Sequence, residues 1–157
     1  MSIGQARLSI RSKKTEVRAQ FAALCFQLSK KKPRILLVST RGTGRWVLPK
    51  GWPINGKTPA QSALREAFEE AGVAGKPFEQ CMGHYSYTKY IKIDQPVPCI
   101  VAVFPIEVDK LNEDFPELGQ RKLVWLSPEK AAKRVSEPEL KPILRDFDPR
   151  KLRPSKA

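Results

Sequence analysis

One segment near the middle of the chain carries a complete set of helix signals, and it constrains the fold more than any other stretch. Thr58 can cap the helix, Pro59 suits its first position, Gln61 completes a capping box, and Gly72 follows the last turn. At about 100° per residue the apolar side chains form one stripe suited to packing on a sheet. The members of this stripe are Ala60, Leu64, Ala67, Phe68 and Ala71. The segment therefore predicts an amphipathic helix over residues 59–71.

Apolar runs bounded by turn residues predict strands on both sides of this helix. They cover residues 17–29, 34–41, 78–91, 96–108 and 122–126, whereas the run over residues 45–51 is expected to lead into a shaped loop before the helix. Two shorter helices are expected near the end, one capped by Ser127 and one within residues 137–147. This order favours one mixed α/β domain over residues 17–148. We expect a flexible basic arm at residues 1–16 and a basic tail at residues 149–157.

The charge of the chain is large and unevenly distributed. The net charge is +13, and Glu16 is the only acidic residue among residues 1–57, whereas acidic residues prevail between residues 58 and 120. A nucleic acid, an anionic membrane or a densely phosphorylated small molecule would each suit such a surface. The alternative is a solvated basic surface that has no dedicated partner. The basic arm has no apolar helical face, so a membrane is the least favoured partner.

Cysteine and histidine are too sparse to suggest a disulfide framework or a zinc site. The chain has three cysteines without a C-x-x-C pair and a single histidine. No stretch resembles the apolar core of a signal peptide, so a cytoplasmic location is expected.

Three glutamates gather in the second half of the predicted helix. Glu66, Glu69 and Glu70 spread over the side away from the apolar stripe. Such a cluster is often only a solvated acidic face, but carboxylates near a helix C-terminus are disfavoured by the macrodipole unless another charge stabilises them. Mg²⁺ and Mn²⁺ prefer oxygen ligands of this kind. The cluster therefore indicates a site for one of these two divalent ions.

The stretch GWPINGKTPAQSALREAFEEAGV, Gly51 to Val73, resembles the signature of the Nudix hydrolases. The positions in register are Gly51, Arg65, Glu66, Ala67, Glu69, Glu70, Gly72 and Val73. The resemblance implies an α/β/α sandwich around a mixed sheet, and hydrolysis of pyrophosphate linkages with Mg²⁺ or Mn²⁺. It also implies Glu66 and Glu70 as metal ligands, Glu69 as the general base or a further ligand, and Arg65 as the residue that orients the glutamates.

One position departs from that signature. Lys57 stands where the family places its first glutamate, which pairs with the arginine of the motif. Lys57 cannot make this ion pair, and Glu69, four residues after Arg65, is the candidate replacement.

The order of segments over residues 17–147 is similar to that of diphosphoinositol polyphosphate phosphohydrolases and diadenosine polyphosphate hydrolases. This likeness implies phosphate contacts by residues 18 and 39–41, with Lys50 at the edge of the loop. Pro96 to Pro98 replace a His-Arg pair that is common in the group. With the basic residues of the first third, the candidate substrate-binding set is Arg18, Ser39, Thr40, Arg41, Lys50, Gly51 and Lys57.

The leading hypothesis is a metal-dependent hydrolase that cleaves a pyrophosphate linkage in a dinucleoside polyphosphate or a diphosphoinositol polyphosphate. Two alternatives use the basic surface differently. One is a pyrophosphohydrolase acting on RNA 5′ ends, and the other is a non-catalytic protein that binds nucleic acid with a Nudix fold.

Overall fold

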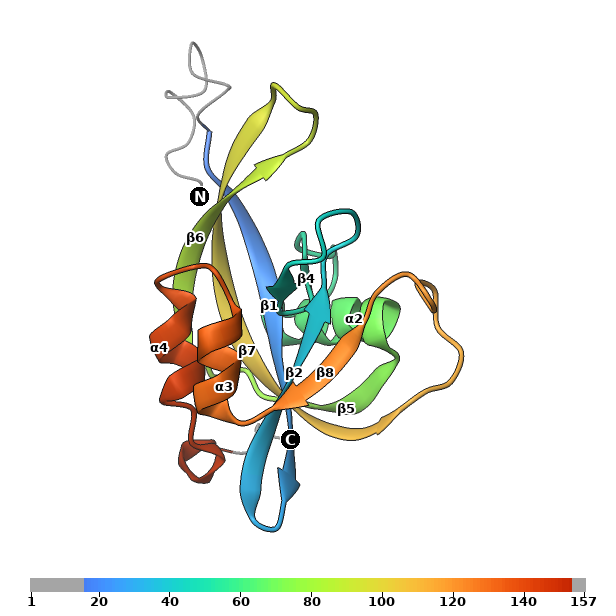
Figure 1. Cartoon of the computed structure of the whole chain (residues 1–157), viewed down its shortest axis with the longest axis vertical. Coiled ribbons are helices and arrows are strands. Elements are labelled where there is room, and N and C mark those ends of the chain that lie inside the picture. The colour runs from blue at the N-terminus through green and yellow to red at the C-terminus, as the bar shows by residue number, and fades with distance from the viewer. Residues whose placement is uncertain (1–15, 154–157) are drawn as a thin grey trace.

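The long first strand organises the sheet in the computed structural model, which describes residues 16–153. Strand β1 (Arg18–Ser29) pairs in parallel with β7 (Pro96–Leu111) along one edge. Along its other edge it pairs antiparallel with β2 (Lys32–Ser39) and β4 (Lys50–Gly51). The sheet is therefore mixed, with β1 at its centre (Figure 1).

Four further strands complete an eight-stranded sheet around this centre. Strand β2 also pairs with β3 (Trp46–Val47) and β8 (Leu123–Leu126). The two halves of β7 pair with β6 (Gly83–Tyr90) and β5 (Val73–Pro77).

Helices cover both faces of the sheet. Helix α2 (Pro59–Ala71) packs on one face, and α3 (Pro128–Arg134) and α4 (Leu140–Arg145) pack on the other. Strand β1 is buried from both sides, since residues 22, 24 and 26 face α3 and α4 while residues 23 and 25 face α2. The expected α/β/α sandwich is confirmed. No helix within residues 16–153 has the length and apolar character needed to span a membrane.

Helix α2 has the predicted bounds and caps, but its buried face is rotated from the predicted stripe. The Thr58 side chain accepts a hydrogen bond from the Gln61 N–H and the capping box is complete. The small side chains approach the sheet most closely, so Ala63 and Glu70 are buried while Leu64 and Phe68 are only half-buried. The prediction that all three glutamates lie away from the core was wrong for Glu70.

The strand predictions were right in order and incomplete in detail. Strand β5 was not predicted, because it contains Gly75, a proline and a bulge, all features that weaken a strand pattern. Strand β6 begins five residues after the predicted start at residue 78. The run over residues 45–51, expected to lead into a loop, contains two strands of two residues each.

The predicted terminal segments lie mostly outside the described residues. This holds for the basic arm, of which only Glu16 is described, and for residues 154–157 of the tail. The described part of the tail continues the fold, because residues 149–151 form the 3₁₀ helix η2 (Pro149–Lys151) and Leu152 packs against the core.

Gly72 lies where helix α2 contacts the segment after β7, and a substitution there tests how tightly the two are packed. Its φ is 76°, and a Cβ there would lie 2.7 Å from the Asn112 carbonyl oxygen and from Phe115. Gly56 has a similar φ of 83° but open space around it. Gly56→Ala should lower the free energy of unfolding by about 1–2 kcal/mol. Gly72→Ala should cost a further 1–3 kcal/mol or so, because neighbouring atoms must also move.

Urea unfolding of the two variants and the wild type measures this difference. Equal destabilisation by the two substitutions would show that the contacts around Gly72 do not constrain the helix end.

Candidate active site

The carboxylates of helix α2 lie against strand β4. Glu66 is half-buried beside Gly51, and a Cβ at position 51 would lie within 2.6 Å of both Glu66 carboxylate oxygens. Glycine is therefore the residue that leaves room for this carboxylate. Glu70, one turn later, is only 6% exposed.

Arg121 neutralises part of this negative charge from the segment between β7 and β8. Its side chain is 11% exposed, and its Nε lies 2.9 Å from Glu117 Oε1 and 3.8 Å from Glu70 Oε1. Its Nη1 also donates to the Ser39 carbonyl at 3.1 Å. One guanidinium thus connects helix α2, the end of β2 and the segment before β8.

Glu117 adds a fourth carboxylate that the sequence analysis did not select. Its backbone N–H donates to the Glu69 carbonyl at 2.9 Å, which holds the segment against the end of α2. Burial, followed by the charges of Glu69 and Glu117, raises the pKa of Glu66 to about 7. Burial also raises the pKa of Glu70 to about 7, although Arg121 and Lys50 act in the opposite direction. Burial is thus the main reason that both carboxyl groups hold their protons more tightly than they would in water.

Arg65 pairs with Glu69, as expected from the substitution at position 57. Arg65 Nε lies 2.7 Å from Glu69 Oε2. Lys57 is exposed on the loop before α2, and no ion pair of its side chain is found within residues 16–153. The i, i+4 pair within the helix thus takes the place of the pair that the family signature would make.

The three glutamates of the motif do not converge as the sequence suggested. Glu69 is paired with Arg65 and Glu70 with Arg121, so their side chains have different partners. Across the described residues, no group of three or more His, Cys, Asp or Glu side chains stands at metal-ligand spacing.

The donor set nevertheless fits a hard divalent cation. Glu66 and Glu70 supply carboxylate oxygens, and both have raised pKa values because burial and the other acidic side chains disfavour their charged forms. A cation would relieve this repulsion. Glu66 and Glu70 are therefore the residues that would hold Mg²⁺ or Mn²⁺, and the ligand role of Glu69 stays a prediction.

A small polar cavity of about 210 Å³ opens beside Glu70. Four basic side chains line it, namely Arg41, Lys50, Lys89 and Arg121. Gln20, Thr40, Val47, Glu70 and Tyr87 complete the lining. We call this hollow the polar cavity. Its excess of positive charge next to a carboxylate cluster suits a phosphate group.

A buried acid from the α3–α4 connection also influences the polar cavity. Glu137 is 8% exposed, and its Oε2 lies 3.6 Å from Arg45. Its other oxygen has no hydrogen-bond partner among residues 16–153. Burial lowers the pKa of Lys50, while the charges of Glu70 and Glu137 oppose that shift. Glu137 thus helps to keep Lys50 protonated.

The polar cavity brings together only part of the predicted substrate-binding set. Thr40, Arg41 and Lys50 line it, with Lys50 Nζ 4.8 Å from the centre of the Tyr87 ring. Arg18 instead stacks on Trp52 at 4.7 Å. The Ser39 hydroxyl accepts a hydrogen bond from the Lys122 N–H.

Gly51 and Lys57 also lie outside the lining of the polar cavity. Gly51 makes room for the Glu66 carboxylate, whereas Lys57 is exposed on the loop. Substrate contact by any of these seven residues stays a prediction.

Sequence reasoning missed several residues of this site: Gln20, Lys89, Glu117, Arg121 and Glu137. Most come from strands or connections far along the chain from the motif. The available signal was Gln20, a polar residue directly before the apolar run of β1, and its Oε1 accepts a hydrogen bond from the Tyr87 hydroxyl at 2.5 Å.

The mixed sheet carries helix α2 with its three glutamates on one face, and Glu70 borders the basic polar cavity. The model of the NUDIX domain matches residues 18–147, and the chain belongs to the Nudix family.

Several named proteins are moderately similar to this chain in sequence. Diphosphoinositol polyphosphate phosphohydrolase 3-beta from Bos taurus is 33% identical over 113 residues, 71% of this chain and 65% of that protein. Nudix hydrolase 16, mitochondrial, from Arabidopsis thaliana is 30% identical over 114 residues, 71% of this chain and 63% of that protein. The matched region spans just under two thirds of the length of these relatives.

Solved structures share the fold at lower identity. The C. elegans Ap4A hydrolase has a TM-score of 0.57 at 21% identity, covering 82% of this chain and 94% of that one. A NUDIX hydrolase from Nitrosomonas europaea has a TM-score of 0.63 at 19% identity, covering 87% and 92% of the two chains. These likenesses show the fold alone.

The raised pKa values predict a pH-dependent stability in the metal-free protein. Between pH 4.5 and about pH 7 the unfolded chain releases the protons that folded Glu66 and Glu70 retain. Their contribution to the free energy of unfolding is therefore fully present below pH 4.5 and is lost by about pH 7. Glu70→Gln cannot lose its part of this contribution, so its Tm should rise relative to wild type as the pH increases.

Thermal unfolding in a chelator from about pH 5 to about pH 8 gives this difference in Tm. A difference that stays constant across the range would contradict the raised pKa of Glu70.

Proposed function

We propose that the chain is a divalent-metal-dependent pyrophosphohydrolase that acts on a densely phosphorylated small molecule. The observation that carries this proposal is the polar cavity, where four basic side chains stand next to Glu70. A polyphosphate approaches carboxylates only when positive charge lies between them. Cations on one side and glutamates on the other meet that requirement.

Each group then has a chemical task. Arg41 and Arg121 can grip phosphate oxygens with their guanidinium groups, and Lys50 and Lys89 add point charges. When bound, a divalent ion supplies further positive charge against the phosphates and eases the deprotonation of water.

Two carboxylates are available to take the proton released by the attacking water. Glu69 is the proposed base, and its ion pair with Arg65 fixes its position on the helix. Glu117 is the second acid beside the cluster, and Arg121 holds it there.

The four basic side chains of the polar cavity suit a substrate with several adjacent phosphates, and this points to the substrate class. Dinucleoside polyphosphates and diphosphoinositol polyphosphates both provide them, and both classes appear in the names of similar proteins. Pro96 to Pro98 replace the His-Arg pair common in the group, and this departure weighs against recognition of an inositol pyrophosphate.

Activity is tested with Mg²⁺ or Mn²⁺ on a panel that includes a diadenosine polyphosphate, a diphosphoinositol polyphosphate, ADP-ribose, a nucleoside triphosphate and 5′-triphosphorylated RNA. Glu69→Gln should lower kcat by about 10²–10⁴-fold if Glu69 is the base. Lys89→Gln should mainly raise KM, since its charge binds the phosphates before and during reaction. Lys110→Gln, an exposed lysine on β7, is the matched control and should change neither.

Three outcomes would redirect the assignment. Full activity of Glu69→Gln, with loss in Glu117→Gln, would move the base to Glu117. Turnover of the triphosphorylated RNA alone would indicate an RNA 5′-end hydrolase. No turnover with either metal, combined with binding of nucleic acid, would indicate a non-catalytic Nudix protein.

A further inference from the structure

A second basic surface lies at the other end of strand β2 from the polar cavity. The β1–β2 hairpin projects from the lower end of the molecule (Figure 1). Lys32 begins β2 and Ser39 ends it. At roughly 3.3 Å per residue these ends stand about 23 Å apart, so the hairpin is remote from the candidate active site.

The hairpin and helix α3 enclose a groove of about 1060 Å³. Its basic lining residues are Lys30, Lys32, Arg34, Lys130, Lys133 and Arg145. Glu129 is the one acidic lining residue. Arg145 pairs with Asp146, but within residues 16–153 the other five basic side chains form no ion pair. We call this hollow the basic groove.

The turn of the hairpin holds two lysines in backbone conformations that are unfavourable for them. Lys30 and Lys31 have φ values of 53° and 66°, in the left-handed region where glycine and asparagine are the usual residues. Two lysines in these positions make the turn less stable than glycine would. The exposed lysines also repel one another. Both features are understandable if an anionic partner uses these side chains.

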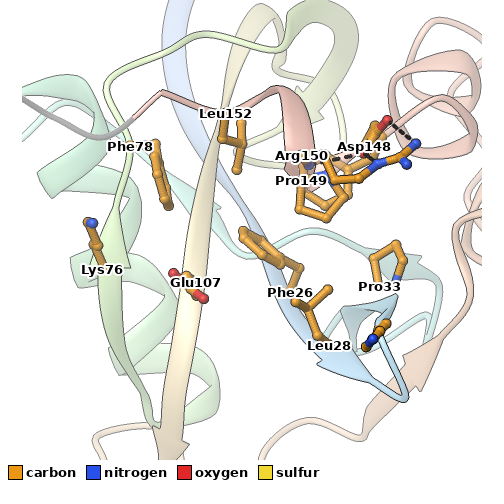
Figure 2. Close-up of a pocket in the computed structure, with 12 residues that line it drawn as sticks. Phe26, Leu28, Pro33, Lys76, Phe78, Glu107, Asp148, Pro149, Arg150 and Leu152 are labelled. Atoms are coloured by element: carbon orange, nitrogen blue, oxygen red, sulfur yellow. Dashed lines mark hydrogen bonds and ion pairs between the residues drawn. The ribbon is translucent and has the colours of Figure 1, made fainter.

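A cavity lined by both apolar and charged side chains adjoins the basic groove. It has a volume of about 710 Å³ and shares Pro33 and Phe147 with the groove. Figure 2 shows Phe26 and Phe78 around this hollow, with Lys76 and Glu107 near its edge. Lys31, from the same turn, lines it too, whereas Arg150 at its margin is paired with Asp148. We call this hollow the aromatic cavity.

We propose that the basic groove binds the phosphodiester backbone of a single-stranded nucleic acid, with an unpaired base at the mouth of the aromatic cavity. The five unpaired cations suit a row of phosphates. Phe26, Phe78 and Phe147 are buried at the floor of the cavity, whereas Leu28 at its mouth is 55% exposed and offers an apolar contact to the face of an unstacked base. A duplex offers no free base to the aromatic cavity. A flat bilayer would reach the rim of the groove and leave its concave wall unused. The proposal does not depend on hydrolysis at the polar cavity.

The test is fluorescence anisotropy of the full-length chain with labelled twelve-nucleotide RNA and DNA strands and a duplex. The variant Lys30→Gln/Lys133→Gln removes two charges from the groove, and Lys92→Gln/Lys110→Gln removes two exposed charges elsewhere. The groove variant should weaken single-strand binding about tenfold and reduce the slope of log K against log salt by about 1.4. The control should weaken binding less than about twofold.

A second variant distinguishes a loss of binding from a loss of folding stability. Lys30→Gly/Lys31→Gly suits the turn better, so it should raise Tm while weakening binding. Turnover of the small-molecule substrate should stay unchanged in all these variants. Preference for RNA or for DNA identifies the natural strand, and either supports the proposal.

Equal loss in the groove and control variants would overturn the proposal, because binding would then depend on net charge alone. Duplex binding as tight as single-strand binding would also overturn it. Sedimentation with vesicles of mixed neutral and anionic phospholipids, in the absence of any oligonucleotide binding, would point to a membrane instead.

Discussion

The ion pairs of Arg121 hold the candidate site together. Helix α2 places Glu70 in a buried position, and the segment before β8 brings Glu117 to the same place. Two carboxylates at this depth would repel each other strongly without a cation between the segments. Arg121 contacts both, and it also donates to the Ser39 carbonyl at the end of β2. Removing its charge would release the connection that closes the site.

The same arrangement divides the site into two electrostatic halves. On one side Glu66 and Glu70 carry negative charge that burial makes costly, and on the other the polar cavity gathers basic side chains. Glu70 belongs to both halves, since it lines the polar cavity. In the proposed function a divalent ion would neutralise the acidic half and a polyphosphate the basic half. Such a division would account for a strongly basic protein that concentrates glutamates on one helix.

The sequence predicted the local features of this site and missed those that depend on long-range contacts. Helix α2 was predicted to the residue because its caps and motif lie within one continuous stretch. The Arg65–Glu69 pair followed from helical spacing. The burial of Glu70 was missed because alanines, and not the larger Leu64 and Phe68, make the closest approach to the sheet. Lys89 and Arg121 reach the site only through the pairing of β6 with β7 and of β2 with β8, which no local pattern specifies.

In the proposed divalent-ion site, the ligands are the buried glutamates Glu66 and Glu70, whose pKa values are raised. Calorimetric titration with Mn²⁺ in buffers of different ionisation enthalpy measures the protons released on binding. Because the pKa values of Glu66 and Glu70 lie near 7, binding should release a substantial fraction of a proton at about pH 6.5 and little at about pH 8.5. Glu70→Gln should bind weakly and release less. Tight binding without proton release at the lower pH, unchanged in Glu70→Gln, would place the ion elsewhere and contradict the account.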